Sequence, residues 1–307
     1  MVGGDGEVLI VLPGDGVGGL GVGFIEQGAP GGVAEEGDDI AVVDEAEDVL
    51  GGVVGDADAV AHELGDEQEE INCLKMVLNR QVDGLILVSS RLDTAMLQTL
   101  LKPEFPWVHV GGYAPGNCRN VCLMDYKKGA YQMTSHLLKL GHKEITLLLD
   151  DRSQVEIDAI TTGYRNAMKE NGLPCDRKVL RAAGSVQGGY LLAQKLVQNH
   201  QLPPVLITAS EEQAFGITKA AMDEQIDIPG QLALACLQDS QIASILNPPL
   251  TALELPSHRL GLTAARMLFD CIESGDSSCV PQEIILQPTL KVRRSCGNTK
   301  PVYEMFG

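Results

Sequence analysis

From Asp66 onward, short apolar runs alternate with longer amphipathic segments, and this alternation constrains the fold more than any other feature. The run at residues 82–88 (VDGLILV) follows an amphipathic segment at residues 66–79 whose first turn is acidic. A short apolar run is typical of a strand buried on both faces, whereas acids at a helix start interact favourably with the helix dipole. Because the unit repeats, the sequence predicts an α/β fold with parallel sheets covered by helices on both faces.

The same patterns give the expected elements along the chain. The predicted strands cover residues 82–88, 106–110, 120–124, 144–149, 205–208, 231–237, 251–254, 283–286 and 289–292. The predicted helices cover residues 66–79, 94–101, 128–140, 154–170, 187–200, 212–225 and 258–272. A chain of 307 residues can bury the core of one large domain or of two medium ones, and its length favours two.

Composition changes sharply ahead of this region. The first 74 residues contain no lysine or arginine and 19 of the 42 acidic residues, so they account for the whole net charge of -19. Residues 1–65 consist mostly of Gly, Val, Ala, Asp and Glu, whose codons all begin with G. We expect an acidic segment at residues 1–65 that is disordered or translated from a shifted frame, a folded core at 66–298 and a tail at 299–307.

An alternative interpretation makes this segment a dinucleotide site. The strand-like residues 7–13 precede Gly14, Gly16 and Gly19 in a GxGxxG pattern, and a second strand-like run ends at Asp44. Such a site needs a helix that opens at the third glycine and faces a pyrophosphate. Residues 20–24 (LGVGF) are poor helix formers, so a nucleotide-dependent oxidoreductase is the weaker of the two hypotheses.

Several other function classes find no support in the sequence. No long apolar run and no secretory signal is present, which predicts a cytoplasmic protein that makes no contact with a membrane. The eight cysteines form no CxxC pair, so we expect reduced, mostly buried thiols, no metal site and no cofactor. Ser89, Ser135 and Ser153 lack a GxSxG elbow, so we expect no hydrolase triad and no enzyme activity. The acidic segment would be repelled by DNA, and no helix-turn-helix can be placed in it.

A set of short motifs resembles the effector-binding core of the LacI/GalR family of bacterial transcription regulators. Their order and spacing carry the resemblance over about residues 66–296. The motifs are residues 82–87, Asp125 with Gly129-Ala130, residues 136–145, Gly163-Tyr164, Ile228-Pro229, residues 248–251, Leu260-Gly261 and the tail at residues 290–295.

The resemblance implies a two-subdomain clamshell of the periplasmic-binding-protein type, between whose lobes the chain crosses three times. It also implies a transcription regulator that holds a small effector, a sugar or a related metabolite, in the cleft and that forms a homodimer. Members of the family carry a DNA-reading headpiece ahead of the core, so operator DNA is a partner only if the intact protein has one. A solute-binding protein is a third hypothesis, which the lack of an export signal disfavours.

Several residues at predicted strand ends are candidate effector contacts, and Asp125, Ser210 and Gln238 are the polar residues that we expect to bind the effector. Asp125 lies where the family places an acid that contacts effector hydroxyls, although a helix N-cap is an equal alternative. Ser210 and Glu211 occupy the place of the family's Asn-Asp pair, and helix capping is the alternative for Ser210.

Four candidates, Gln238 among them, show a departure from the family pattern or a weaker placement. Gln238 and Asp239 stand where many members have paired acids, and Ile160 stands where sugar-binding members keep an arginine. Ser89 follows the strand predicted at residues 82–88. These departures favour an effector that differs from a typical sugar and is less polar.

Overall fold

The structure, a computed structural model, describes residues 7–11, 22–26, 71–72, 74–75, 78–79, 83–88, 92, 94–111, 120–175, 178–274 and 281–299. The chain forms two compact units. Unit 1 comprises Met1–Met124 and Ser257–Leu286, and unit 2 comprises Asp125–Pro256 and Gln287–Gly307. The chain therefore passes three times from one unit to the other. Both units have the predicted α/β architecture, which is confirmed.

The described part of unit 1 contains a six-stranded sheet in the order β11-β5-β4-β3-β1-β2. Neighbouring strands are parallel except for β1 and β2. The elements are β1 (Glu7–Val11), β2 (Val22–Glu26), β3 (Gly84–Val88), α3 (Thr94–Leu100), β4 (Trp107–Gly111), β5 (Asn120–Met124), α9 (Ser257–Ser274) and β11 (Gln282–Leu286).

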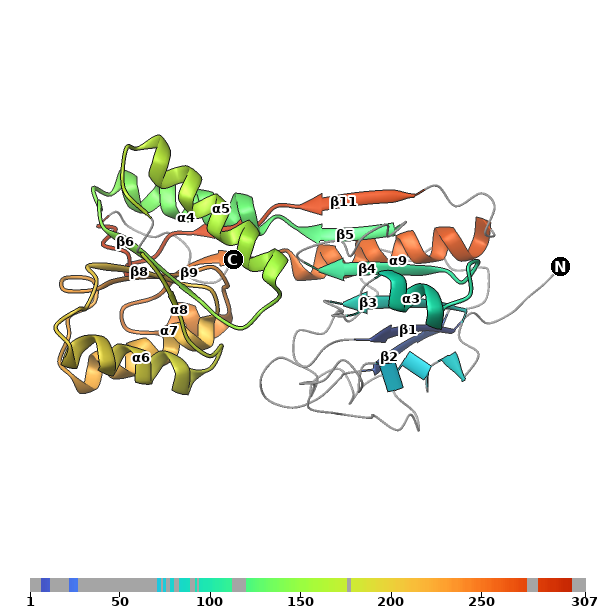
Figure 1. Cartoon of the computed structure of the whole chain (residues 1–307), viewed down its shortest axis with the longest axis horizontal. Helices are drawn as coiled ribbons and strands as arrows, with labels where there is room; N and C mark the ends of the chain where they lie inside the picture. Colours follow the sequence, from blue (N-terminus) through green and yellow to red (C-terminus); the bar gives the residue numbers. More distant parts are fainter. Residues whose placement is uncertain are drawn as a thin grey trace. The chain divides into compact units, whose positions relative to one another are not determined.

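Strand β3 is buried on both faces, as its continuous apolar run predicts. Leu85 and Leu87 pack with Leu97 of α3 on one face of the sheet. Ile86 points to the opposite face and packs with Leu268 of α9, which lies along β3, β4 and β5 (Figure 1). Successive strand side chains point to opposite faces, so a strand between two layers of helices must be apolar throughout.

The described part of unit 2 also contains a six-stranded sheet, in the order β12-β10-β9-β8-β6-β7. Only the pair β10 and β12 is antiparallel. The elements are α4 (Tyr126–Lys139), β6 (Ile145–Leu149), α5 (Gln154–Glu170), β7 (Val179–Arg181), α6 (Val186–Gln198), β8 (Val205–Thr208), α7 (Glu211–Asp223), β9 (Ala233–Cys236), α8 (Gln241–Ile245), β10 (Thr251–Glu254) and β12 (Thr289–Lys291).

Helices cover both faces of this sheet in pairs. Helices α4 and α5 pack together on one face and α6 and α7 on the other, with β6, β8 and β9 between the pairs (Figure 1). Leu147 of β6 belongs to the core with α4 and α5, whereas its neighbour Leu148 belongs to the core with α6 and α7. Charged side chains are therefore excluded from the middle of these strands and appear where the strands end.

From residue 66 onward, the described structure departs from the prediction at two short elements and one cysteine. Strand β7 has three residues and helix α8 has five, too few to show a period in the sequence. Cys271 is disulfide-bonded, so the expectation of reduced thiols is wrong at this position. Cys122, Cys175, Cys236 and Cys296 are free and buried, as expected.

The acidic segment contributes β1 and β2 to unit 1. Strand β2 covers Val22–Glu26, within the region where the dinucleotide hypothesis requires a helix that opens at Gly19. An extended strand cannot direct a helix N-terminus at a pyrophosphate, so this observation removes the support for that hypothesis. The glycines of the GxGxxG pattern and Asp44 lie outside the described residues.

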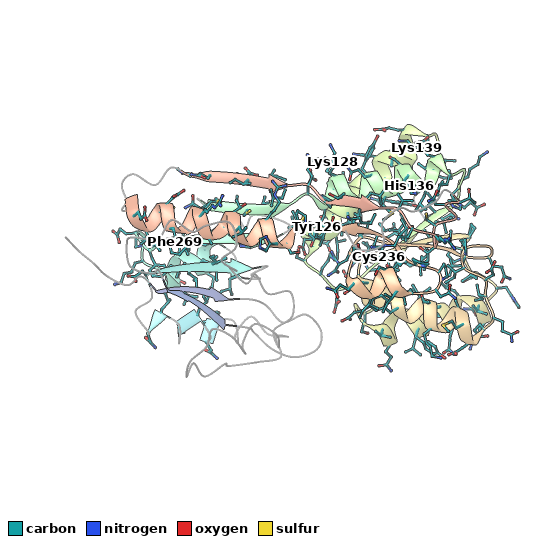
Figure 2. The ribbon with its side chains drawn as sticks, turned by 180° about the vertical axis from the view of Figure 1, so that it is seen from behind. Tyr126, Lys128, His136, Lys139, Cys236 and Phe269 are labelled. Atoms are coloured by element: carbon teal, nitrogen blue, oxygen red, sulfur yellow. The ribbon has the colours of Figure 1, made fainter. Side chains whose placement is uncertain are left out.

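A turn that follows β12 is anchored to both the sheet and α4. The Ser295 hydroxyl donates to Leu234 O (2.6 Å) and accepts from Thr251 N (2.8 Å). The sulfur of Cys296 lies 3.6 Å from His136 Nε2, and Cys296 O lies 2.9 Å from His142 Nε2. Burial lowers the pKa of His136, and the positive charges of Lys139 and His142 lower it further. Figure 2 shows His136 and Lys139 on α4.

Glycine at position 163 permits the close approach of α5 to α4. A Cβ atom there would overlap Lys127 O and would also lie 3.0 Å from Tyr131 N. Both neighbouring atoms belong to the backbone of α4 and cannot rotate away. This packing fixes the first turn of α4, where Asp125 and Tyr126 lie.

We expect Gly163→Ala to lower the free energy of unfolding by about 1–3 kcal/mol, because the added methyl group overpacks the contact between the helices. Urea unfolding followed by circular dichroism measures the change. Thr162→Ala is the control, because Thr162 is exposed on the same helix. Equal stability of the two variants would contradict the overlap with Lys127 O.

We expect His136 to make the stability of the protein depend on pH. Its folded-state pKa lies below the ordinary value of 6.5, so the unfolded chain binds this proton more readily than the folded chain does. The free energy of unfolding should therefore fall as the pH drops below about 6.5, until the folded state is also protonated. His136→Asn should reduce this slope in urea titrations between about pH 7 and pH 5. His200→Asn should retain it, because His200 is exposed and its backbone (φ 54°) suits asparagine.

Candidate functional site

The polar candidates of unit 2 meet at the carboxyl edge of its sheet. Strands β6, β8 and β9 are parallel neighbours, so the segments that follow them emerge at the same edge. Asp150 and Arg152 follow β6, Ser210 follows β8, and Gln238 follows β9. Tyr126 at the start of α4 and Cys236 at the end of β9, both labelled in Figure 2, also belong to this edge. The carboxyl edge of a parallel sheet is the usual place for a ligand site.

Arg152 is the most firmly held side chain at this edge. Its Nε donates to Asp150 Oδ1 and its Nη2 to Asp150 Oδ2, each at 2.6 Å. Nη2 also donates to Ala209 O (3.2 Å), and the guanidinium lies over the Tyr126 ring at 5.5 Å from its centroid. Only 15% of the Arg152 side chain and 7% of the Asp150 side chain are exposed. Burial acts to lower the pKa of Arg152, but the hydrogen bond and charge of Asp150 outweigh it and raise that pKa.

One edge of the guanidinium remains available. Within the part of the chain that the structure describes, Nη1 of Arg152 makes no hydrogen bond, whereas Nε and Nη2 are both engaged. A planar guanidinium that is fixed on one side presents its remaining N–H donors in a defined direction. Arg152 can therefore donate to an acceptor that approaches the sheet edge.

Ser210 is fixed in place by the first turn of α7. Its hydroxyl accepts from Gln213 N (3.3 Å), which confirms the helix-capping role, and the residue is 9% exposed. The fully buried Gln213 amide then donates to Leu149 O (3.3 Å), Ala182 O (3.0 Å) and Ala183 O (3.3 Å). One side chain thus ties the start of α7 to the ends of β6 and β7.

Asp125 caps helix α4. Its Oδ1 accepts from Lys128 N (2.8 Å), which confirms one of the two interpretations of this residue. The side chain is half-buried, and Oδ2 has no hydrogen bond within the described residues. An effector contact through Oδ2 is compatible with the cap and stays a prediction.

Gln238 presents an amide at the end of β9. Its backbone N–H donates to Cys236 Sγ (3.4 Å), and its half-buried side chain makes no hydrogen bond to the described part of the chain. Burial raises the pKa of Cys236 to about 12, so this thiol stays protonated at neutral pH. A protonated, fully buried thiol is a poor nucleophile, whereas the amide of Gln238 can both donate to and accept from a ligand.

The remaining predicted residues are placed differently. Both carboxylate oxygens of Asp239 bind Arg293, at 2.6 and 2.8 Å, and Arg293 Nη1 also donates to Leu250 O (2.7 Å). Ile160 is fully buried in the hydrophobic core with α4 and the sheet, so it presents no surface at the edge. Ser89 lies outside the described residues.

Arg152 is the residue that the sequence analysis missed. The signal was present, because Asp150-Asp151-Arg152 directly follows the strand predicted at residues 144–149. A charged triplet at the end of a buried strand reaches the carboxyl edge of the sheet wherever the strand is parallel.

The described residues contain no group of three or more His, Cys, Asp or Glu side chains that could hold a metal ion. Among the helices of the described ranges, none combines the length and the hydropathy that a membrane crossing requires.

We expect Arg293→Met to lower the free energy of unfolding by about 3–5 kcal/mol, because it leaves the mostly buried carboxylate of Asp239 without a partner. Side chains in this pair are 14% and 10% exposed. The double variant Arg293→Met with Asp239→Asn should regain part of the loss in urea unfolding. Lys219→Ala, which breaks the exposed pair with Asp223, should leave the stability unchanged. A single variant as stable as the wild type would refute this account.

Comparison with known proteins agrees with this architecture. A model of the periplasmic binding protein-like domain matches residues 134–296. The chain is 25% identical over 218 residues to catabolite control protein A of Priestia megaterium, a match that covers 70% of this chain and 66% of that relative. The chain therefore spans about two thirds of the length of this relative.

Solved structures show the same fold. The transcription regulator CcpA of Lactococcus lactis is 27% identical, with a TM-score of 0.65, over 75% of this chain and 84% of that one. A LacI family transcriptional regulator of Enterococcus faecium, solved with bound ribose, is 24% identical, with a TM-score of 0.67, over 73% and 83% of the two chains. The chain belongs to the periplasmic binding protein-like family, and within it to the LacI family of transcriptional regulators.

Proposed function

We propose that this chain is the effector-binding core of a LacI-type transcriptional regulator. A small molecule binds at the carboxyl edge of the unit 2 sheet, and its binding energy favours one conformation of the chain over another. The observation that carries the proposal is the convergence of Arg152, Ser210 and Gln238 at this edge in a chain whose relatives are regulators.

The available hydrogen-bonding groups fit a ligand with several hydroxyl or carbonyl groups. Nη1 of Arg152 donates, Oδ2 of Asp125 accepts, and the amide of Gln238 does both. Glu211, the first residue of α7, adds a carboxylate beside Ser210. A sugar or a related metabolite has the matching groups, and the regulator from Enterococcus faecium was solved with ribose.

The same side chains support a role in signalling without catalysis. The Cys236 thiol stays protonated, and the hydroxyls of Ser153 and Ser210 are engaged as helix caps. None of these groups is poised as a nucleophile. We propose that the protein is not an enzyme, that it acts as a homodimer, and that operator DNA is bound by a part of the intact protein outside the described residues.

A thermal unfolding screen of the full chain tests the proposal. The panel contains neutral monosaccharides, nucleosides and nucleobases, and the readout is the shift in Tm. A ligand present at about 100 times its Kd stabilises the folded state by about 2.7 kcal/mol. We expect at least one member to raise Tm and to be recovered unchanged by NMR after prolonged incubation. A conversion of the ligand, or a panel without any stabilising member, would count against the proposal.

Two substitutions separate the roles of Asp125. Asparagine caps a helix about as well as aspartate, so Asp125→Asn should keep the stability of the protein but weaken binding of the stabilising ligand by about tenfold. Asp125→Ala should weaken binding similarly and also lower the free energy of unfolding by about 1 kcal/mol. Calorimetric titration and urea unfolding measure the two effects. If Asp125→Asn binds as tightly as the wild type, Asp125 is a helix cap only.

A further inference from the structure

The positive charge of Arg152 is neutralised by an adjacent carboxylate. Asp150 occupies two of its nitrogens with both carboxylate oxygens, and the two side chains are mostly buried together. A bidentate pair of this kind has little net charge, although its unused N–H groups remain hydrogen-bond donors. The site therefore keeps the direction of an arginine donor without the attraction for anions that an unpaired guanidinium has.

The surroundings add negative charge. The negative charge of Glu156 lies close enough to Arg152 to raise the pKa of that arginine. The charges of Glu211 and Arg152 both influence the pKa of the Cys236 thiol, so both residues lie near this thiol. Asp151 accepts from Gly184 N (3.3 Å) at the same edge. Exposed cations are also present, namely Lys127 and Lys128 on α4 and Arg181 at the end of β7, and water screens their charges.

Helices α5 and α7, which begin after β6 and β8, do not offset this charge. A helix N-terminus normally attracts anions through its free N–H groups and its dipole. Helices α5 and α7 carry acids of their own in the first turn, Glu156 in α5 and Glu211 with Glu212 in α7. Glu156 also accepts from the Ser153 hydroxyl (2.9 Å), which holds its carboxylate at the helix start. An anionic ligand that approached either helix N-terminus would therefore be repelled by these carboxylates.

We infer that Asp150 makes this site selective for uncharged ligands and excludes phosphates and carboxylates. The inference rests on the proposed function, because it names the ligand class of the same site. Asp150 acts as a specificity determinant: it holds Arg152 in place and removes the charge that would otherwise recruit an anion. Uncharged hydroxyl and carbonyl groups can accept a hydrogen bond from Nη1 of Arg152, and the nearby carboxylates do not repel them as they repel an anion.

Inorganic phosphate is the probe for this inference, measured by calorimetric titration of the full chain. The wild type should show no saturable binding at phosphate concentrations up to about 10 mM. Asp150→Asn leaves Arg152 without its counter-charge and should bind phosphate at least about tenfold more tightly than the wild type does. The double variant Asp150→Asn with Arg152→Gln should lose this gain, because the guanidinium is then absent.

Glu144→Gln is the matched control. It removes the same charge just before the opposite end of β6, where Glu144 forms an exposed pair with Lys178 (3.1 Å). It should not bind phosphate more tightly than the wild type. An equal gain in Glu144→Gln would show that net charge alone is responsible and would overturn the inference, as would a folded Asp150→Asn without any gain.

A second measurement covers the case in which Asp150→Asn does not fold. Wild-type protein is titrated with ribose and with ribose 5-phosphate, and with any stabilising ligand from the screen beside its phosphate ester. Each neutral compound that binds should bind at least about tenfold more tightly than its ester. Saturable wild-type binding of inorganic phosphate at concentrations up to about 10 mM, or an ester that binds as tightly as its neutral compound, would overturn the inference. These results separate failure of this inference from failure of the proposed function. If the proposed function fails, the screen finds no ligand, but the phosphate titrations of the wild type and the variants can still give the expected result.

Discussion

A parallel strand that is covered by helices on both faces places charged side chains only at its ends. Leu147 and Leu148 of β6 face different helix pairs, so neither position tolerates a charged group. The charged triplet Asp150-Asp151-Arg152 begins at the first position beyond the strand. Hydrophobic burial therefore decides where the polar chemistry of unit 2 occurs, and the parallel direction of β6, β8 and β9 brings it to one edge.

Two mostly buried ion pairs show that the same interaction can serve different purposes. Asp239 and Arg293 join the segment after β9 to the segment after β12, and Arg293 also binds the carbonyl of Leu250, so both terminal nitrogens of Arg293 are engaged within the protein. Asp150 and Arg152 are two residues apart and leave one edge of the guanidinium unused. The first pair stabilises the fold, whereas the second also presents a donor whose charge is already balanced.

Most of the fold could be predicted from the sequence, because two-sided burial leaves a strong pattern. Strands β5, β8 and β10 and helix α5 have the predicted bounds. Strand β7 was missed because its three residues are too few for a period, and each is at least partly exposed. The site was harder to predict, because the partner of Asp239 lies 54 residues away and the partner of Asp150 is visible only when the strand end is known. The local sequence pattern predicts where the strands end, but only the tertiary structure shows which charged residues pair with each other.

The three passages of the chain between the units have a consequence for the order in which the protein is made. Strands β3 and β4 leave the ribosome early, but α9, which covers one of their faces, follows only after residues 125–256 have been synthesised. Ile86 and Val108 on that face therefore remain uncovered by α9 while the larger part of the other unit is synthesised. A nascent chain of this kind exposes an apolar sheet surface for the time needed to translate more than a hundred codons, which makes it a natural client for chaperones that bind hydrophobic segments.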